Sequence, residues 1–342
     1  MSDFPLLLAG PILRRVEPGL VSVWVATREA CTVKVEVYLG LKRATDVAGG
    51  ETVAKAEAST IRVGEQLHIV VVMARPEAKS GLMPEQNYSY NVTLSGPSGT
   101  KDLAGLHLLE ECRIADDGSI ETDKKKPAKA NLPLGYQPGF LPSFALPPLQ
   151  LTDLRIVHGS CRRANADGPD GLAWVDDFIE SAKGDPKKRP HQLLLTGDQI
   201  YADDVARPML NMLNSATKFL IGGKLDAPDN TLPIEKLPVA GKSWPADVVH
   251  FPVGYRKTLV LDEGRMTSHD GESHLFSLGE FCAMYLFAWS NACWPNAMPA
   301  FGNFLEVMPQ ELLIPPELKR PHVFASDEDL LSFQGRPCHS SR

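Results

Sequence analysis

The sequence predicts a two-part fold, in which an N-terminal β-sandwich is followed by an α/β unit with a parallel sheet. Three observations predict it. Short β-branched runs alternate with polar residues in the first hundred positions, a proline-rich stretch follows, and the pattern then changes to strand, helix and strand. The 342 residues suffice for two domains of ordinary size.

The β-sandwich is predicted over residues 8–113. Its strands are expected at residues 20–26, 33–39, 67–74 and 88–94. In the second of these, Val33, Val35 and Val37 fall on one face, as expected for a strand with one buried side. Turn residues separate the runs at positions 17–19, 49–50 and 96–99. This spacing of short strands is typical of a sandwich.

Residues 114–150 are predicted to be a linker. A charged stretch at 116–126 is followed by prolines at positions 127, 133, 138, 142, 147 and 148. Proline lacks a backbone N–H and therefore does not fit a regular helix or a central strand.

Residues 151–342 are predicted to begin with a βαβ unit. Positions 154–158 and 192–196 are short apolar runs, and positions 171–183 have helical spacing. Such a unit implies parallel strands, with ligands at their carboxyl ends. Beyond it, helices are expected at 205–221 and 275–290, with a long excursion over 222–258.

The charge and composition of the chain argue against several classes of protein. Lys and Arg total 35 against 42 Asp and Glu, and this net charge of −7 disfavours nucleic-acid binding, although a local basic pocket stays open. The apolar runs at 6–9 and 281–288 are too short for a secretory signal or a membrane span. A cytoplasmic protein without a membrane span is expected. The six cysteines form no Cys-x-x-Cys pair, so neither a disulfide framework nor a zinc ribbon is indicated.

Both predicted parallel strands run into residues that could carry chemistry. Asp198 follows Gly197 at the end of a strand, where its carboxylate could bridge two hard cations. Tyr201 could supply a phenolate and Cys161 a thiolate, because a bound metal lowers the pKa of both groups. Each also has a plainer interpretation: Gly197-Asp198 as a turn, Cys161 as a small buried side chain and Tyr201 as a packed aromatic.

The polar residues next to these candidates also have both a functional and a plainer structural interpretation. Arg162 and Arg163 could bind a phosphate group bidentately, or could simply be solvated. Asp203 and Asp204 are interpreted as the N-cap and first-turn acid of the following helix. His158 lies inside a strand run and is interpreted as a core histidine with satisfied hydrogen bonds.

A family resemblance rests on these motifs together. They are Ala-Gly-Pro-Ile-Leu-Arg-Arg at 9–15, Val-Ser-Val-Trp-Val-Ala-Thr at 21–27, Gly-Ser-Cys-Arg at 159–162 and Leu-Thr-Gly-Asp-Gln-Ile-Tyr-Ala-Asp-Asp at 195–204. In order and spacing they resemble the PhoD-like (alkaline phosphatase D) metallophosphoesterases, over about residues 1 to 300.

The resemblance implies a fold, a reaction and a set of roles. It implies an N-terminal β-sandwich followed by an αββα metallophosphoesterase domain, which hydrolyses phosphomonoesters and phosphodiesters at an iron and calcium site. Asp198 would bridge the metals, and Cys161 and Tyr201 would hold iron. A metal-bound hydroxide would attack phosphorus, with Arg162 or Arg163 binding the phosphoryl oxygens.

The sequence also departs from this family. Its members carry further ligands in an Asp-Asp-His-Asp/Glu segment, and no such segment occurs here. The nearest acidic and histidine clusters, at 268–270 and 272–274, are interpreted as loop residues. The polar stretch that ends at Arg342 is unlike a domain boundary, so the αββα domain is expected to be incomplete, by truncation. The alternative is therefore a catalytically inactive relative or a non-catalytic interaction module, and the oligomeric state stays open.

Overall fold

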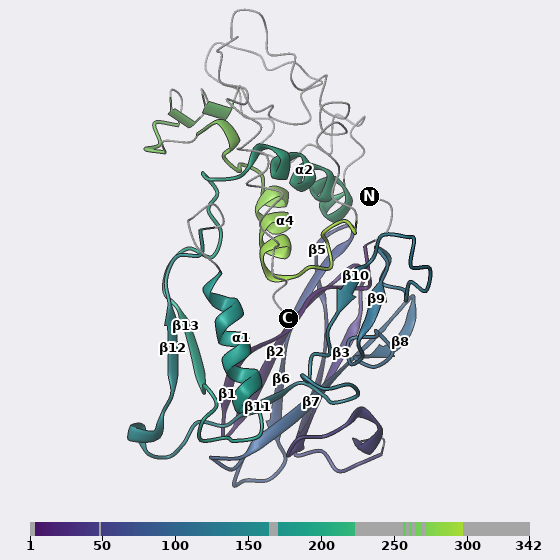
Figure 1. The fold of residues 1–342 in the computed structure, drawn as a ribbon, viewed down its shortest axis with the longest axis vertical. Helices are drawn as coiled ribbons and strands as arrows, with labels where there is room; N and C mark the ends of the chain where they lie inside the picture. Colours follow the sequence, from purple (N-terminus) through teal and green to yellow (C-terminus); the bar gives the residue numbers. More distant parts are fainter. Residues whose placement is uncertain are drawn as a thin grey trace, which may run out of the picture.

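The computed structural model describes residues 4–47, 49–163, 170–222, 256–257, 260–261, 264–268 and 271–296. The centre of the described part is a nine-stranded antiparallel sheet that curls on itself (Figure 1). Its strands are β1 (Leu7–Glu17), β2 (Leu20–Thr27), β3 (Thr32–Leu39), β4 (Ala54–Ser59), β5 (Ile61–Gly64), β6 (Leu67–Pro76), β7 (Asn87–Gly96), β8 (Gly99–Asp102) and β11 (Ser143–Ala145).

The strand order is β1-β2-β6-β4-β3-β7-β11, with β5 paired to β6 and β8 to β7. Strands β2 and β6 pair along their length, from Val21 opposite Ala74 to Thr27 opposite His68. By contrast, β4 and β6 share a short register at one end, where Ala54 lies opposite Pro76. The sheet turns at this short junction, which brings its two halves face to face.

The concave side of the sheet holds the main hydrophobic core. Alternation explains this: Val33, Val35 and Val37 on β3 have no exposed surface, whereas Lys34 and Glu36 between them are partly exposed and form an ion pair of 2.7 Å. Burial of such valines is worth about 1.5–3 kcal/mol each. The predicted strands at 20–26, 33–39, 67–74 and 88–94 are confirmed within two residues at each end.

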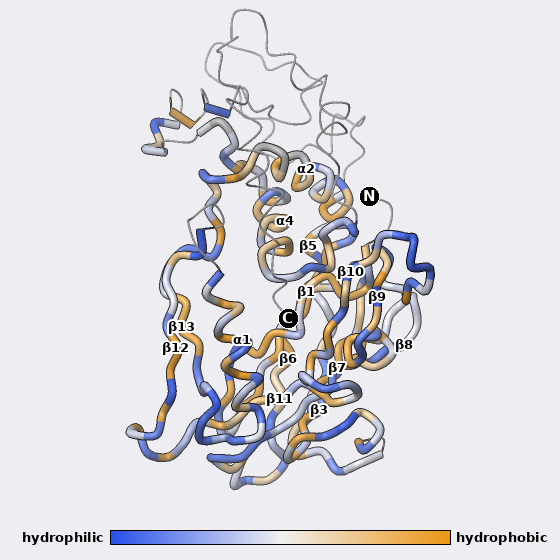
Figure 2. Tube along the Cα trace, viewed as in Figure 1, coloured by the Kyte–Doolittle hydropathy of each residue, from blue (hydrophilic) through white to orange (hydrophobic). Residues whose placement is uncertain are grey.

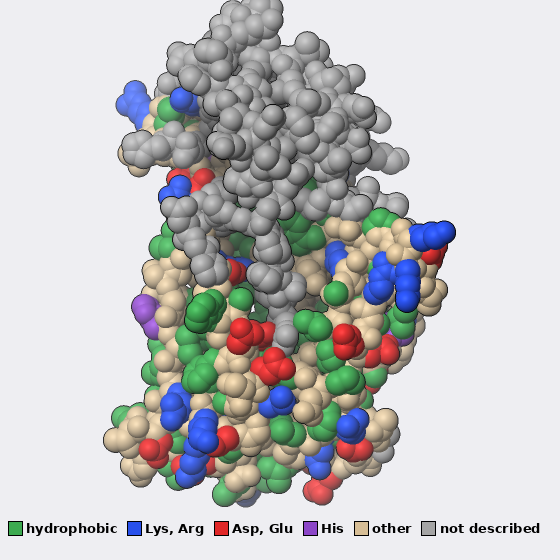
Figure 3. Space-filling model, in the orientation of Figure 1, with side chains coloured by type: hydrophobic (Ala, Val, Ile, Leu, Met, Phe, Trp, Pro, Cys, Tyr) green, Lys and Arg blue, Asp and Glu red, His purple; other side chains and the backbone are tan. Residues whose placement is uncertain are grey.

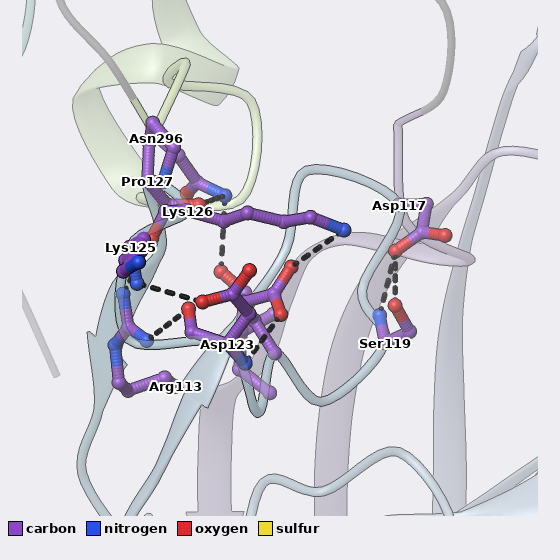
Figure 4. A network of polar contacts seen from close by, with 10 residues as sticks. Arg113, Asp117, Ser119, Asp123, Lys125, Lys126, Pro127 and Asn296 are labelled. Atoms are coloured by element: carbon purple, nitrogen blue, oxygen red, sulfur yellow. Dashed lines mark hydrogen bonds and ion pairs between the residues drawn. The ribbon is translucent and has the colours of Figure 1, made fainter.

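The predicted linker contains structure of its own. Strands β9 (Cys112–Ile114) and β10 (Lys129–Asn131) form an antiparallel pair, and β11 joins β7 of the main sheet. Figure 4 shows the loop between β9 and β10, where Arg113 donates to the carbonyl oxygens of Asp123 and Lys126. The Pro-rich stretch over 114–150 thus carries short strands, of which β11 lies at the edge of the main sheet and none is a central strand.

The βαβ prediction is confirmed. Strands β12 (Ile156–Gly159) and β13 (Gln192–Leu195) pair in parallel, and helix α1 (Gly171–Ala182) lies between them in the chain. The helix begins after Asp170, whose side chain accepts a hydrogen bond of 3.1 Å from the amide of Leu172. This N-cap satisfies one of the free amides at the start of the helix.

Two further helices form a second hydrophobic cluster with the convex side of the sheet. They are α2 (Arg207–Ile221) and α4 (Leu278–Trp289), which pack on one another near β1 and β5 (Figure 1). Leu8 of β1 and Leu67 of β6 are buried among them, and Figure 2 shows apolar residues along both helices. The predicted helices at 205–221 and 275–290 are confirmed with slightly shorter bounds. Most of the predicted excursion at 222–258 lies outside the described residues.

Glycine at position 64 allows α2 to reach the sheet. A Cβ atom there would lie 2.4 Å from the carbonyl oxygen of Leu220. The adjoining amides of Glu65 and Gln66 donate to the carbonyl oxygens of Ile221 and Leu220, at 3.0 and 2.9 Å. The β5–β6 turn therefore caps the last carbonyl groups of α2, which have no partner within the helix.

The predicted fold class needs correction. The described residues form a mostly β structure around one curled antiparallel sheet, with few helices and a single two-stranded parallel pair. The strands of the expected sandwich are present, but an αββα metallophosphoesterase-like domain, complete or incomplete, is not what they form. In the described part of the chain, no helix combines the length and apolar character needed to cross a membrane.

Candidate functional site

The carboxyl ends of β12 and β13 bring the predicted site residues together. Gly159 lies opposite Leu195 in the parallel register, so the segments that follow the two strands leave the sheet side by side. The amide of Thr196 donates to the carbonyl oxygen of Gly159 at 3.0 Å, and the amide of Arg162 donates to that of Asp198 at 2.7 Å. The two segments are therefore joined through their backbones.

Gly197 makes this approach possible. A Cβ atom at that position would lie 2.6 Å from Ser160 Oγ, 2.7 Å from Cys161 Sγ and 2.8 Å from the amide nitrogen of Cys161. Real Cβ atoms do not come so close to other heavy atoms, so the position requires glycine. The Gly-Asp pair is thus more than a turn: its glycine lets the second segment lie against the first.

Hydrogen-bond donors converge on the sulfur of Cys161. They are the hydroxyl of Tyr201, the hydroxyl of Ser160 at 3.6 Å and the amide of Asp198. The bond from Tyr201 is the largest influence, and together they hold the pKa of the Cys161 thiol below its usual value. The same bond with Cys161 raises the pKa of Tyr201 to about 12. Cys161 is exposed, so the plainer interpretation as a buried side chain was wrong.

Both candidate arginines have carboxylate partners. Arg162 donates from Nε and Nη2 to one oxygen of Asp170, at 3.0 and 2.6 Å, and from Nη1 to the carbonyl oxygen of Ala288. Arg163 pairs with Asp204 at 2.5 Å. Arg162 therefore connects the site to the start of α1 and to the end of α4. Its role in binding phosphoryl oxygens stays a prediction.

Other predictions near the site also change. Helix α2 has Ala206 at its N-cap, so Asp203 and Asp204 do not cap it. Asp203 accepts a hydrogen bond from Ser268 at 3.3 Å instead. His158 is exposed and its Nε2 lies 2.7 Å from Thr196 Oγ1, so it is no core histidine.

The expected metal centre is not formed by the described residues. Among them, no group of three or more His, Cys, Asp and Glu side chains could hold a metal ion. Cys161 and Asp198 adjoin one another with Tyr201, but in the described part of the chain no histidine or further carboxylate completes a ligand set there. His269 and Asp270 lie outside the described residues. The expectation of a metal-binding phosphatase site is therefore corrected for the described residues, whereas iron and calcium as cofactors stay a prediction.

Comparison with known protein families gives a match for the N-terminal part of the chain. Residues 5–102 match a family described as a domain of unknown function, DUF7800. This match covers the strands from β1 to β8. No curated protein matches the chain.

Solved structures give weak likenesses. One is the catalytic module of the multi-modular glycogen-degrading pneumococcal virulence factor SpuA with an inhibitor, at 17% identity over 51% of this chain and 24% of that one, with a TM-score of 0.19. Another is a glycosyl hydrolase family 2 member from Bacteroides cellulosilyticus, at 10% identity over 64% of this chain and 34% of that one, with a TM-score of 0.18. This chain therefore spans a quarter to a third of their lengths. The resemblance to PhoD-like proteins stays a prediction.

Proposed function

We propose that this chain is a non-catalytic interaction module, in which the curled sheet is the stable platform and the β12–α1–β13 unit is the surface that binds a second copy of the chain. One observation carries the proposal. The elements of that unit have the apolar sequences of buried structure, yet several of their largest apolar side chains are exposed.

The two strands illustrate this. Leu193 and Leu194 of β13 point to opposite faces of the sheet and are 44% and 45% exposed, and Ile156 of β12 is 48% exposed. Parallel strands are normally covered on both faces, since their crossover connections place helices there. An uncovered parallel pair is therefore a surface that association can bury.

Helix α1 adds to the same surface. Trp174 and Phe178 lie one turn apart on one side of the helix, and Trp174 is 70% exposed. Figure 3 shows hydrophobic side chains gathered over the position of α1. Monomeric soluble proteins rarely expose large contiguous apolar patches, and aromatic side chains are enriched at interfaces.

A second copy is the occupant that the chemistry of the patch favours. In a two-fold dimer the same surface meets itself, so the surface must be self-complementary. The aromatic residues Trp174 and Phe178 on one side of α1 meet this condition, because apolar side chains need no oppositely charged partner.

The experiment measures oligomeric state. Sedimentation velocity of the full chain over a range of concentrations should show a reversible dimer. Trp174→Lys combined with Phe178→Lys should leave a folded monomer, since both side chains are exposed and contribute little to folding. Met83→Lys, an exposed apolar position outside the unit, is the matched control and should still dimerise. A monomer at every concentration, or a dimer that survives the double substitution, contradicts the proposal.

A further inference from the structure

Polar contacts attach the β12–α1–β13 unit to the curled sheet. Among the described residues, neither of the two hydrophobic clusters includes a residue of β12, α1 or β13. From Gly171 to Leu195, a range described in full, only Ala182 and Arg189 are buried. The position of the unit on the sheet therefore depends on a few hydrogen bonds rather than on a shared apolar core.

Arg189, which precedes β13, makes the most buried of these contacts. The residue is 6% exposed. Its Nη1 donates to Ser143 Oγ at 2.9 Å, and its Nη2 donates to the carbonyl oxygen of Ser143. No carboxylate of a described residue pairs with the guanidinium, and burial lowers the pKa of Arg189. A buried charge is costly unless it is hydrogen-bonded, so the attached position of the unit depends on both bonds to Ser143.

Ser143 lies at a free edge of the main sheet. Its strand, β11, is the last in the strand order and pairs with β7. The carbonyl oxygen of Pro142, the preceding residue, accepts from the amide of Tyr90 on β7 at 3.0 Å. Successive backbone groups along a strand point to opposite sides, so those of Ser143 point away from β7. Arg189 therefore covers backbone groups at the free edge, where unpaired groups could join another strand.

Two further contacts lie at the start of β7, beside β11. The side-chain amide of Asn87 donates to the carbonyl oxygen of Gly184 at 3.2 Å, and Lys187 pairs with Glu85 at 3.1 Å. The lysine side chain is exposed, and exposed ion pairs contribute little to stability. The turn between α1 and β13 is thus attached at one corner of the sheet, with Arg189 as its buried contact.

Further hydrogen bonds attach the rest of the unit. The hydroxyl of Tyr136 donates to Asp176 Oδ1 of α1 at 2.8 Å, and Arg162, after β12, donates to the carbonyl oxygen of Ala288 on α4. Two paired strands have little stability of their own in water. When the bonds to the sheet break, the unit should therefore lose its structure, while the nine-stranded sheet keeps its own core.

We propose that the β12–α1–β13 unit is a cover on the free edge of the curled sheet, which Arg189 holds in place through Ser143 and which opens while the sheet stays folded. Such local opening is expected of elements with few buried apolar contacts. The inference goes beyond the interaction function and does not depend on it, because the dimer surface is formed by Trp174 and Phe178 and the contact with the sheet by Arg189.

Native-state hydrogen exchange of the full chain tests this, at a concentration where sedimentation velocity shows the monomer. In the parent, the amides of α1 and β13 should exchange faster than those of β2 but slower than in an unfolded chain. Ser143→Ala removes an acceptor from Arg189 and should speed exchange in α1 and β13 about tenfold, the ratio for one hydrogen bond to a charged group. Exchange in β2 should not change. Ser95→Ala, at an exposed serine of β7, is the matched control and should change neither.

Arg189→Ala removes both bonds and should speed exchange in α1 and β13 about a hundredfold, again without effect on β2. Lys188→Ala is its control, since Lys188 is exposed and pairs with Asp185 of the same turn. Exchange in α1 and β13 that is as slow as in β2, or as fast as in an unfolded chain, overturns the proposal for the parent. So does an unchanged rate in Ser143→Ala, or an Arg189→Ala variant in which sheet and unit change alike. Should Arg189→Ala fail to fold, Ser143→Ala against Ser95→Ala still decides.

Discussion

Gly197 lies so close to Cys161 that a Cβ atom on the glycine would be 2.7 Å from the cysteine sulfur. This contact fixes the two segments that leave the parallel strands. It also sets the position of the Asp198 amide, which donates to that sulfur. The thiol of Cys161 is therefore held in a fixed position at the carboxyl ends of β12 and β13, two strands whose apolar side chains are partly exposed.

Gly197→Ala should separate the two segments. Overpacking of this kind costs about 1–3 kcal/mol, so the amide of Arg162, which donates to Asp198, should exchange with solvent roughly tenfold faster or more. Hydrogen exchange measures this directly. Gly171→Ala, where a Cβ meets nothing within 4 Å, is the control. Unchanged exchange at Arg162 would show that the close approach is not a constraint.

Tyr201→Phe should raise the pKa of Cys161. The tyrosine hydroxyl donates to the sulfur and favours the thiolate, so its removal moves the thiol toward its ordinary pKa. The pH at which alkylation by iodoacetamide reaches half its maximal rate should therefore rise. Tyr285→Phe, an exposed tyrosine on α4, serves as the control, and Cys161→Ser identifies the reactive thiol. An unshifted midpoint in Tyr201→Phe refutes the assigned contact.

Gly64→Ala should loosen α2 from the sheet. The new Cβ would press on the carbonyl oxygen of Leu220, and the fit can be restored only by a shift of the backbone. We expect a loss of about 1–3 kcal/mol in the free energy of unfolding, measured in urea. Gly19→Ala has open space around its Cβ and should cost far less. Equal losses in the two variants would contradict this account.

The buried ion pair between Arg256 and Glu280 makes stability depend on pH. Burial opposes ionisation of Glu280, but the bonds from Arg256 at 2.6 and 3.1 Å, with the amides of Phe276 and Ser277, hold its pKa below the usual 4.5. The stabilisation is fully present above the unfolded pKa and is lost as pH falls through the lower folded pKa.

Glu280→Gln should remove that dependence and destabilise the chain at pH 7. It removes the Glu280 carboxylate from the buried guanidinium of Arg256, and breaking a buried ion pair costs about 3–5 kcal/mol. Urea unfolding between pH 7 and 3 measures both effects. Glu57→Gln, an exposed residue of β4, should leave the profile unchanged. A Glu280→Gln profile that falls in acid as steeply as that of the parent would contradict the assignment.

Single strands and helices could be predicted well from local sequence patterns, but the pairing of strands that lie far apart in the chain could not. The alternation of Val33, Val35 and Val37 identified β3, and the capping residue Ser277 with Glu280 marks the start of α4 in the same local way. Strand β11 was missed because its partner β7 lies about fifty residues away in the chain and its surroundings are rich in proline. No local rule reveals how the sheet curls at the junction of β4 and β6.

The candidate site was predicted in part. Cys161, Asp198 and Tyr201 were expected at the ends of parallel strands, and the structure brings them together. The phosphoryl-binding roles of the arginines stay a prediction; their partners Asp170 and Asp204 could be recognised only in three dimensions.

The central claim, that this chain is a non-catalytic module, is tested most directly by assaying the purified chain for hydrolysis of a chromogenic phosphomonoester with added iron and calcium. Asp198→Asn is the matched variant. The proposal predicts no hydrolysis by either protein, in keeping with the carboxylate partners Asp170 and Asp204 that already hold Arg162 and Arg163. Hydrolysis by the parent that is lost in Asp198→Asn would contradict it.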